Sequence, residues 1–248
     1  MIKLKTVAEI SVMREGALIL AKVIEELKKD ARIGVTTKEL DDSAKNLIEQ
    51  SGGKPSFLNF EGYPAVLCTS LNEEIVHALP SERILKEGDV LSLDLGIIWK
   101  GYHSDMAVTL GIGRISPLAE KLISITRQAM EIGIRECRTG NTTGDVGYRI
   151  QNYVRDNGFE VVRELCGHGI GRKLHEEPQI LNIGKKSGGQ KIKEGMVLCI
   201  EPMVMVGDWK IEKTSDGLGY KTKDNSLSCH FEHEIAVTRK GPWVLTRL

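Results

Sequence analysis

Residues 34–40 read Gly-Val-Thr-Thr-Lys-Glu-Leu, and residues 140–146 read Gly-Asn-Thr-Thr-Gly-Asp-Val. The likeness continues at the same spacing in three matched pairs: Ala44 with Ile150, Ile48 with Val154, and Gly52 with Gly158. Each copy follows a long helical pattern and precedes short segments typical of strands. The repeat therefore predicts an α+β fold in which two pseudo-symmetric halves, roughly residues 1–112 and 113–248, join their strands in one sheet. No low-complexity linker separates the halves, so we expect residues 1–248 to form a single domain.

Two capping boxes mark helix starts in the first half. Thr6 with Glu9 precedes apolar residues at helical spacing and predicts a helix over residues 7–29. Thr36 with Glu39 opens a shorter helix that ends at a pair of glycines. The second half is expected to hold two further helices, one beginning at Ser116-Pro117 and one over about residues 144–157.

The composition is that of an ordinary globular protein, with 41% hydrophobic and 27% charged residues. Lysine plus arginine and aspartate plus glutamate number 34 each, so no net field favours specific binding to nucleic acid or to anionic lipid. The five cysteines are scattered and form no Cys-x-x-Cys pair, which argues against a disulfide framework and a cysteine zinc site. No secretion signal or membrane-length apolar run is evident, and we expect a reduced, cytoplasmic protein that does not enter membranes.

The first candidate site lies in an expected β-hairpin. The alternating residues 89–98 predict a strand, Lys100-Gly101 a tight turn, and residues 102–110 the partner strand. With that turn, Asp94 lies opposite Ala107, and Asp105 is its diagonal neighbour. Both aspartates then project from the same face, roughly 5–8 Å apart at Cβ. Two carboxylates this close repel each other unless one is protonated or a cation lies between them. The hairpin alone leaves two interpretations open, a cation site or two solvated acids on an exposed surface.

A second candidate site lies between Cys166 and Pro178, which read Cys-Gly-His-Gly-Ile-Gly-Arg-Lys-Leu-His-Glu-Glu-Pro. Its two histidines, His168 and His175, are seven residues apart. Glycines on both sides of His168 remove side-chain bulk, so backbone and imidazole can lie close to a third body. That body can be a metal ion, a substrate or a neighbouring strand, and the segment alone does not distinguish among them.

Two glutamates extend this set of polar residues. Glu201 ends the apolar run 196–200, where an unpaired buried charge would be unfavourable, and Glu232 lies in the alternating run 231–237. Each glutamate alone is more commonly a salt-bridge partner. Together with the two aspartates and His168 they make an oxygen-rich set without a thiolate, which suits divalent manganese, iron, cobalt or zinc. Four carboxylates exceed the charge of one dication, and bridging acids can hold two ions about 3.5–4 Å apart.

The ordered motifs of the chain resemble those of type I methionine aminopeptidases, of the bacterial kind without an N-terminal extension. The resemblance covers essentially the whole chain and depends on the following motifs: Asn72-Glu73-Glu74 followed by His77, Asp94, Asp105 within Gly-Tyr-His-Ser-Asp, Gly167-His168-Gly169-Ile170-Gly171, His175-Glu176-Glu177-Pro178, Glu201-Pro202-Met203, and Phe231-Glu232-His233. It implies the pita-bread fold of peptidase family M24. In that fold, two pseudo-symmetric halves pack their helices on a curved, mainly antiparallel sheet.

The resemblance also implies a dinuclear metal site. Asp105 and Glu232 would bridge two divalent ions, Asp94 would chelate one of them, and His168 and Glu201 would bind the other. The ions would be cobalt, manganese, iron, zinc or nickel.

Catalytic and substrate-binding roles are implied in the same way. His77 and His175 would contact the substrate and stabilise the tetrahedral intermediate, while Glu201 would carry a proton from water to the leaving amine. The methionine side chain would occupy an apolar pocket formed by Phe57, Phe60, Tyr63, Cys68, Leu174 and Leu218. Three further histidines match no catalytic position of the family and are expected to be structural: His103, His230 and His233.

The chain departs from the family pattern at three positions. Glu61 stands where many relatives carry a histidine, Leu218 stands at the usual pocket tryptophan, and Ser104 replaces a common glycine. Since all five ligand positions are present, these departures concern affinity and side-chain tolerance rather than the chemistry.

The implied activity is metal-dependent removal of the N-terminal methionine from nascent proteins and peptides with a small second residue. Expected partners are nascent N-termini at the ribosome, and the chain is expected to be a monomer. Xaa-Pro aminopeptidases and prolidases share the fold and ligand types but usually carry an extra N-terminal domain, for which this chain has no room. Type II methionine aminopeptidases carry an inserted helical subdomain between the central histidine and the first glutamate. In this chain only 33 positions separate His168 from Glu201, which argues against that insertion. A catalytically silent binding protein would have broken ligand positions, and none is broken.

Overall fold

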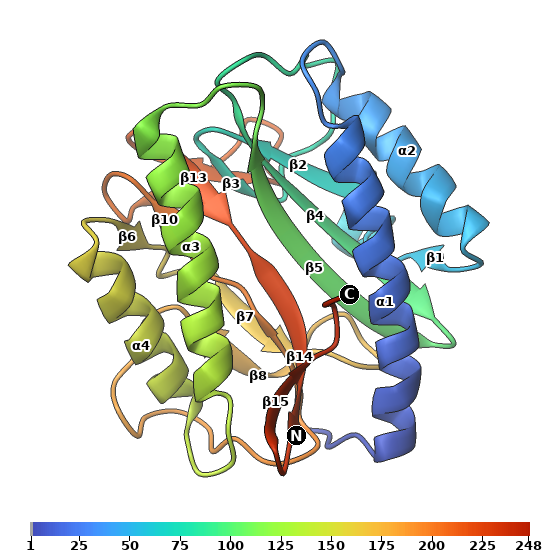
Figure 1. The fold of residues 1–248 in the computed structure, drawn as a ribbon, viewed down its shortest axis with the longest axis vertical. Coiled ribbons are helices and arrows are strands. Elements are labelled where there is room, and N and C mark those ends of the chain that lie inside the picture. The colour runs from blue at the N-terminus through green and yellow to red at the C-terminus, as the bar shows by residue number, and fades with distance from the viewer. Residues whose placement is uncertain (1) are drawn as a thin grey trace.

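The structure, a computed structural model, describes residues 2–248. A nine-stranded sheet forms its centre, with the main path β1-β4-β5-β14-β9-β7-β8, and β2 and β15 pair with β4 and β14 (Figure 1). All of these strand pairs are antiparallel. The strands are β1 (Lys54–Pro55), β2 (Leu67–Leu71), β4 (Val90–Trp99), β5 (Tyr102–Gly111), β7 (Cys166–Gly169), β8 (Glu176–Leu181), β9 (Val197–Ile200), β14 (Glu232–Thr238) and β15 (Gly241–Val244).

Two three-stranded sheets lie beside the main one. The first has the order β13-β10-β6 and the second the order β11-β12-β3. Their strands are β3 (Glu74–Val76), β6 (Glu160–Val161), β10 (Met203–Met205), β11 (Ile211–Lys213), β12 (Tyr220–Thr222) and β13 (Ser228–His230). The second sheet brings the two halves of the sequence together, since β3 pairs with β12, whereas all strands of the first sheet come from the second half.

The helices begin where the capping residues predict. They are α1 (Val7–Asp30), α2 (Thr37–Gln50), α3 (Pro117–Glu136) and α4 (Thr143–Asp156), with a short 3-10 turn η1 (Phe60–Gly62). The boxes at Thr6 and Thr36 are both closed by a glutamate three residues later, and Ser116 accepts the Ala119 N–H. A third box joins Thr142 to Asp145, at the position that the internal repeat matches to Thr36.

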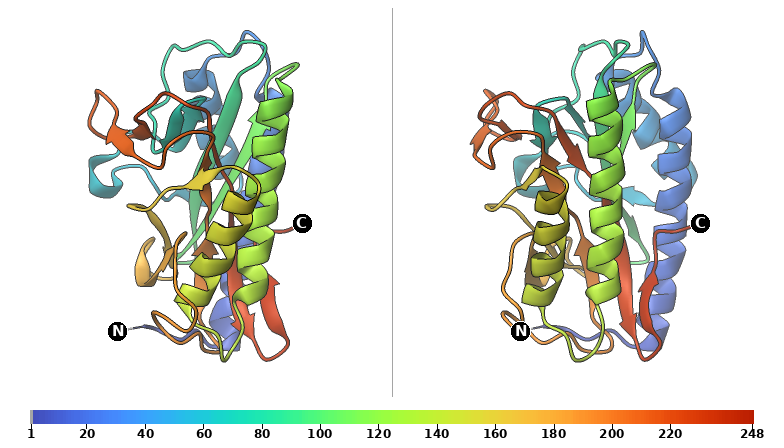
Figure 2. Two further views of the ribbon diagram at one scale, coloured as in Figure 1. Left: turned by 90° about the vertical axis from the view of Figure 1, so that its left-hand side faces the viewer. Right: turned by 60° about the vertical axis from the view of Figure 1, so that its left-hand side comes forward.

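Each long helix runs along one face of the sheet and carries a shorter helix at its side. α2 flanks α1, and α4 flanks α3 (Figure 1, Figure 2). One apolar cluster lies beneath α1 and α2 and a second beneath α3 and α4, so burial of apolar surface stabilises the two helix pairs in the same manner. Within residues 2–248, no helix is both long enough and apolar enough to cross a bilayer.

The β4–β5 hairpin confirms the predicted turn and register. Asp94 lies opposite Ala107, and Gly96 lies opposite Asp105. Leu93 and Leu95 are fully buried in the cluster beneath α1 and α2. Because side chains alternate along a strand, Asp94 points to the opposite face of the sheet.

Candidate metal centre and substrate cleft

Five neighbouring segments bring the predicted metal ligands together. Asp94 is on β4, Asp105 on β5 and His168 on β7, while Glu201 follows β9 and Glu232 begins β14. The sheet order β4-β5-β14-β9-β7 makes these segments adjacent. All five side chains line one cleft of about 860 Å³.

Asp94 and Glu232 share a row across the sheet, and Asp105 lies two residues along β5 from Ala107, the middle residue of that row. Ala107 has Asp94 as its partner on one side and Glu232 on the other, so the smallest of the three side chains separates the two carboxylates. One atom each of Asp105, His168 and Glu232 lies within 4.8 Å of the others. Asp94, Asp105 and Glu232 therefore present several carboxylate oxygens to one small space.

His168 presents one ring nitrogen to this space. Its Nδ1 lies 3.0 Å from the Gly169 carbonyl oxygen, so in the neutral ring Nδ1 donates and Nε2 keeps a free lone pair. His168 Nε2 lies 3.4 Å from Glu201 Oε1 and 3.9 Å from Asp105 Oδ2. An added Cβ on Gly167 would collide with the Cys199 carbonyl of β9, so glycine permits the close approach of β7 that places this ring.

For all four carboxyl groups of the cluster, the ionised form is unfavourable. Burial raises the pKa of Asp94, Asp105, Glu201 and Glu232. Repulsion adds to burial, since Glu232 raises the pKa of Asp105 further, and Asp105 raises that of Glu201. In the described part of the chain, the only ion-pairing partners of these acids are histidines. The cluster therefore lacks positive charge.

A divalent cation fits this set of residues. Asp94 Oδ1, Glu201 Oε1 and Glu232 Oε1 are buried without any hydrogen-bond partner in the described structure. Buried polar atoms normally have a partner, and carboxylate oxygens with one imidazole are ligands that divalent metals accept. Cys199 also lies beside the cluster, but burial raises the pKa of its thiol well above the ordinary value, so it does not offer a thiolate.

The two histidines expected to contact substrate, His77 and His175, both line the cleft. The ring centroid of His175 is 4.4 Å from that of His168 and 5.1 Å from that of Phe60, which meets it edge to face. Burial lowers the pKa of His77 to about 4 and also lowers the pKa of His175. Both rings are therefore neutral near pH 7, and each can donate one hydrogen bond.

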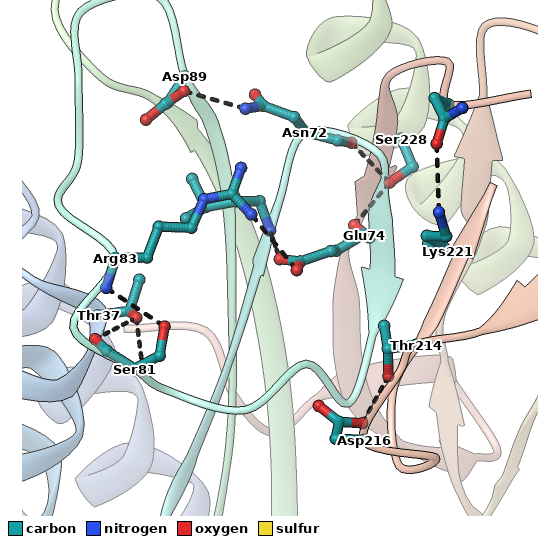
Figure 3. Close-up of polar contacts among 12 residues, drawn as sticks. Thr37, Asn72, Glu74, Ser81, Arg83, Asp89, Thr214, Asp216, Lys221 and Ser228 are labelled. Atoms are coloured by element: carbon teal, nitrogen blue, oxygen red, sulfur yellow. Dashed lines mark hydrogen bonds and ion pairs between the residues drawn. The ribbon is translucent and has the colours of Figure 1, made fainter.

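The segment before His77 is fixed by a polar network (Figure 3). The hydroxyl of Ser228 lies 3.0 Å from the Asn72 carbonyl and 2.7 Å from the Glu74 carbonyl. The Glu74 carboxylate also pairs with Arg83 at 3.4 Å. These contacts hold β3 against β13, and His77 follows β3 directly in a left-handed conformation, with φ of 59°.

The segment around His175 is fixed by Lys5, which lies near the N-terminus. Lys5 Nζ lies 2.8 Å from Glu176 Oε2, and the two side chains are only 6% and 8% exposed. The other carboxylate oxygen of Glu176 accepts the Lys173 N–H at 3.2 Å. A Cβ on Gly171 would collide with both members of the ion pair, so glycine makes room for it. The pair closes the turn that carries His175.

All six residues predicted for the methionine pocket line the same cleft: Phe57, Phe60, Tyr63, Cys68, Leu174 and Leu218. The Tyr63 hydroxyl lies 3.0 Å from the Leu67 carbonyl and 3.1 Å from the Ala78 carbonyl, so its polar atom is satisfied by the backbone. Burial raises the pKa of the Cys68 thiol, which stays neutral. The exposed Glu61 also borders the cleft. The apolar wall of the cleft therefore has an exposed carboxylate at its edge.

Three buried residues near the site have positions or contacts that were not predicted from the sequence. His230, expected to be structural, has its Nε2 3.8 Å from Glu201 Oε2. Glu234 is completely buried on β14, and burial raises its pKa to about 8. Both lie two residues from Glu232, and this spacing could have indicated a shared face. Lys5 gave no such signal because its partner is 171 residues away.

Residues 11–239 match metallopeptidase family M24, and the chain belongs to that family. Its similarity within the family is to the methionine aminopeptidases. It is 44% identical to the methionine aminopeptidase of Clostridium perfringens over 246 residues, 99% of each chain. The crystal structure of methionine aminopeptidase from Thermotoga maritima matches it with a TM-score of 0.98 and 38% identity over 100% of both chains.

Proteins other than methionine aminopeptidases share this fold. The prolidase from Pyrococcus horikoshii matches with a TM-score of 0.79 at 20% identity, covering 98% of this chain and 63% of that one. Likeness at this identity concerns the fold alone. Together the matches confirm the predicted family and the predicted pita-bread fold, and they favour the methionine aminopeptidases over the prolidases.

Proposed function

We propose that this metallopeptidase removes the N-terminal methionine from proteins and peptides, with a preference for a small second residue. One observation carries the proposal: four buried carboxylates and an imidazole, short of positive charge, share a cleft with an apolar pocket. The apolar walls suit an unbranched thioether side chain, and the adjoining acids can bind metal and a free amine. The 44% identity to a methionine aminopeptidase over nearly the whole chain supports the same activity.

Two divalent ions would be held by Asp94, Asp105, His168, Glu201 and Glu232. The support for two ions is the count of four carboxylates, whose negative charge exceeds that of one dication. Such ions, when bound, supply Lewis-acid chemistry that acidifies water and polarises a carbonyl oxygen. Manganese, cobalt, iron, zinc and nickel all accept this combination of oxygen and nitrogen ligands.

Side chains of the protein would transfer the proton, stabilise the oxyanion and bind the substrate. Glu201 accepts a proton from the attacking water and delivers it to the leaving amine, a role favoured by its burial and raised pKa. His175, neutral and beside His168, donates a hydrogen bond to the oxyanion of the tetrahedral intermediate. His77 approaches the substrate from β3. The cleft wall from Phe57 to Leu218 holds the methionine side chain.

We also propose where, and on which substrates, the protein acts. Substrates would be the N-termini of nascent polypeptides at the ribosome, and the protein would act as a cytoplasmic monomer without specific affinity for nucleic acid or membranes. The balance of 34 basic and 34 acidic residues supports the last point.

A panel of peptides and metals tests the proposed function. Metal-free protein should be supplied in turn with Mn²⁺, Co²⁺, Fe²⁺, Zn²⁺ and Ni²⁺, and free methionine should be measured with Met-Ala-Ser as substrate. We expect release of methionine with at least one metal, and no cleavage of Ala-Pro-Ser. Cleavage of the Xaa-Pro peptide with Met-Ala-Ser left intact would instead identify a prolidase-type enzyme.

A further inference from the structure

His230 is a buried histidine without a hydrogen-bond partner. Its side chain is 1% exposed, and neither Nδ1 nor Nε2 has a partner in the described structure. A buried polar group without a partner is unfavourable by about 1–3 kcal/mol, so such groups are rare and need an explanation. Apolar packing would be served better by a leucine or phenylalanine.

The backbone holds this residue firmly in place. Thr109 of β5 accepts the His230 N–H at 3.0 Å and donates its own hydroxyl to the His230 carbonyl at 2.6 Å. On the other side, His230 pairs with Met203 of β10. The ring therefore extends from a fixed point between two strands rather than from a loop.

The ring lies next to Oε2 of the Glu201 carboxylate. His230 Nε2 lies 3.8 Å from Glu201 Oε2, while the other oxygen, Oε1, lies 3.4 Å from His168 Nε2. The carboxylate is thus placed between two imidazoles, one lining the cleft and one behind it. His230 does not line the cleft, so it does not contact substrate. A separation of 3.8 Å exceeds a hydrogen bond, and a shift of about 1 Å would close it.

We propose that His230 is a positioning residue for Glu201, donating a hydrogen bond from Nε2 to Oε2 in the working enzyme. The inference rests on the proposed role of Glu201. Any imidazole carries at least one N–H, and metal-binding carboxylates are commonly oriented by a hydrogen bond to the oxygen that faces away from the metal. With Oε2 held from behind, Oε1 is kept toward the cleft, where the water and the metal ligands meet.

Two substitutions separate this role from simple packing. His230→Gln keeps a neutral N–H donor of similar reach, whereas His230→Leu fills the space without any donor. His233→Gln is the matched control, because that ring lies three residues further on and contacts Thr246 rather than the site. For each protein we would measure kcat and KM on Met-Ala-Ser, the Mn²⁺ dissociation constant of the metal-free form by calorimetry, and the melting temperature.

We expect His230→Leu to lower kcat about 10–100-fold and to weaken Mn²⁺ binding about tenfold, with KM changed less than about twofold. His230→Gln should recover most of both losses. A His230→Leu protein with wild-type kcat and Mn²⁺ affinity would overturn the proposal. So would equal losses in both His230 variants accompanied by equal falls in melting temperature. If the wild type fails to cleave Met-Ala-Ser, the calorimetric comparison still tests the positioning of Glu201 independently.

Discussion

Replacing Glu234 by glutamine should stabilise the protein, and the gain should grow as the pH rises. Glu234 is completely buried, and both of its carboxylate oxygens lack a hydrogen-bond partner in the described structure. Burial raises its pKa from 4.5 to about 8, and the positive charge of Lys5 only partly opposes this effect. The ionised form is therefore unfavourable in the folded protein.

The size and sign of the effect follow from proton linkage. The unfolded chain loses the Glu234 proton near its ordinary pKa of 4.5, whereas the folded protein keeps it until about pH 8. The stability that this group contributes is therefore complete at low pH and is lost as the pH rises through that window. One proton is equivalent to about 1.4 kcal/mol per pH unit. From about pH 5.5 to about pH 7.5, the advantage of the glutamine variant should widen by about 2.5 kcal/mol.

Urea denaturation of metal-free protein at the two pH values would measure this change. Glu49→Gln is the matched control for the loss of one carboxyl group, because Glu49 is exposed on α2. A free-energy difference between Glu234→Gln and the parent that is independent of pH would refute the argument. A disadvantage of the variant that grows with pH would show instead that Glu234 is ionised and stabilised by Lys5.

Three further predictions concern the site. Lys5→Met should lower the free energy of unfolding by about 3 kcal/mol, because it leaves the Glu176 carboxylate buried and unpaired, and it should lower kcat through His175. Lys38→Met, which breaks an exposed ion pair, should leave the free energy of unfolding nearly unchanged. Glu232→Ala should lower the metal content measured by plasma mass spectrometry together with the rate, and full activity at normal metal content would exclude Glu232 as a ligand. Removal of metal by a chelator should lower the melting temperature more at about pH 8 than at about pH 6, because the four buried carboxyl groups have raised pKa values and ionise as the pH rises; an equal fall at both pH values would contradict this.

Features fixed by local sequence were predicted correctly. The capping boxes at Thr6 and Thr36 and the Ser116 cap each depend on residues three positions apart, and each helix begins there. The β4–β5 register depends on a two-residue turn, so Asp94 could be placed opposite Ala107 from the sequence. The grouping of the predicted ligands and pocket residues in one cleft also agrees with the motifs that carry the family resemblance.

What the sequence did not reveal depends on long-range packing. The ion pair of Lys5 with Glu176 joins residues that are 171 positions apart, and nothing near Lys5 indicates its partner. Ser104, which replaces a common glycine, does not line the cleft but lies buried with its hydroxyl 3.4 Å from the Met13 carbonyl of α1. The chemistry of His230 became visible only when β13 and the end of β9 were seen side by side. The division into halves at about residue 112, within a single catalytic domain, stays a prediction, as do the roles of the individual site residues.

We expect the metal-loaded protein to release methionine from a free N-terminus. Mass spectrometry would test this with Met-Ala-Ser and N-acetyl-Met-Ala-Ser, each incubated with Mn²⁺-loaded protein and with the chelated form. The expected products are free methionine and Ala-Ser from the unblocked peptide with metal, and no product from the blocked peptide or from the chelated protein. Release of methionine without metal, or cleavage of the acetylated peptide at an equal rate, would contradict this expectation.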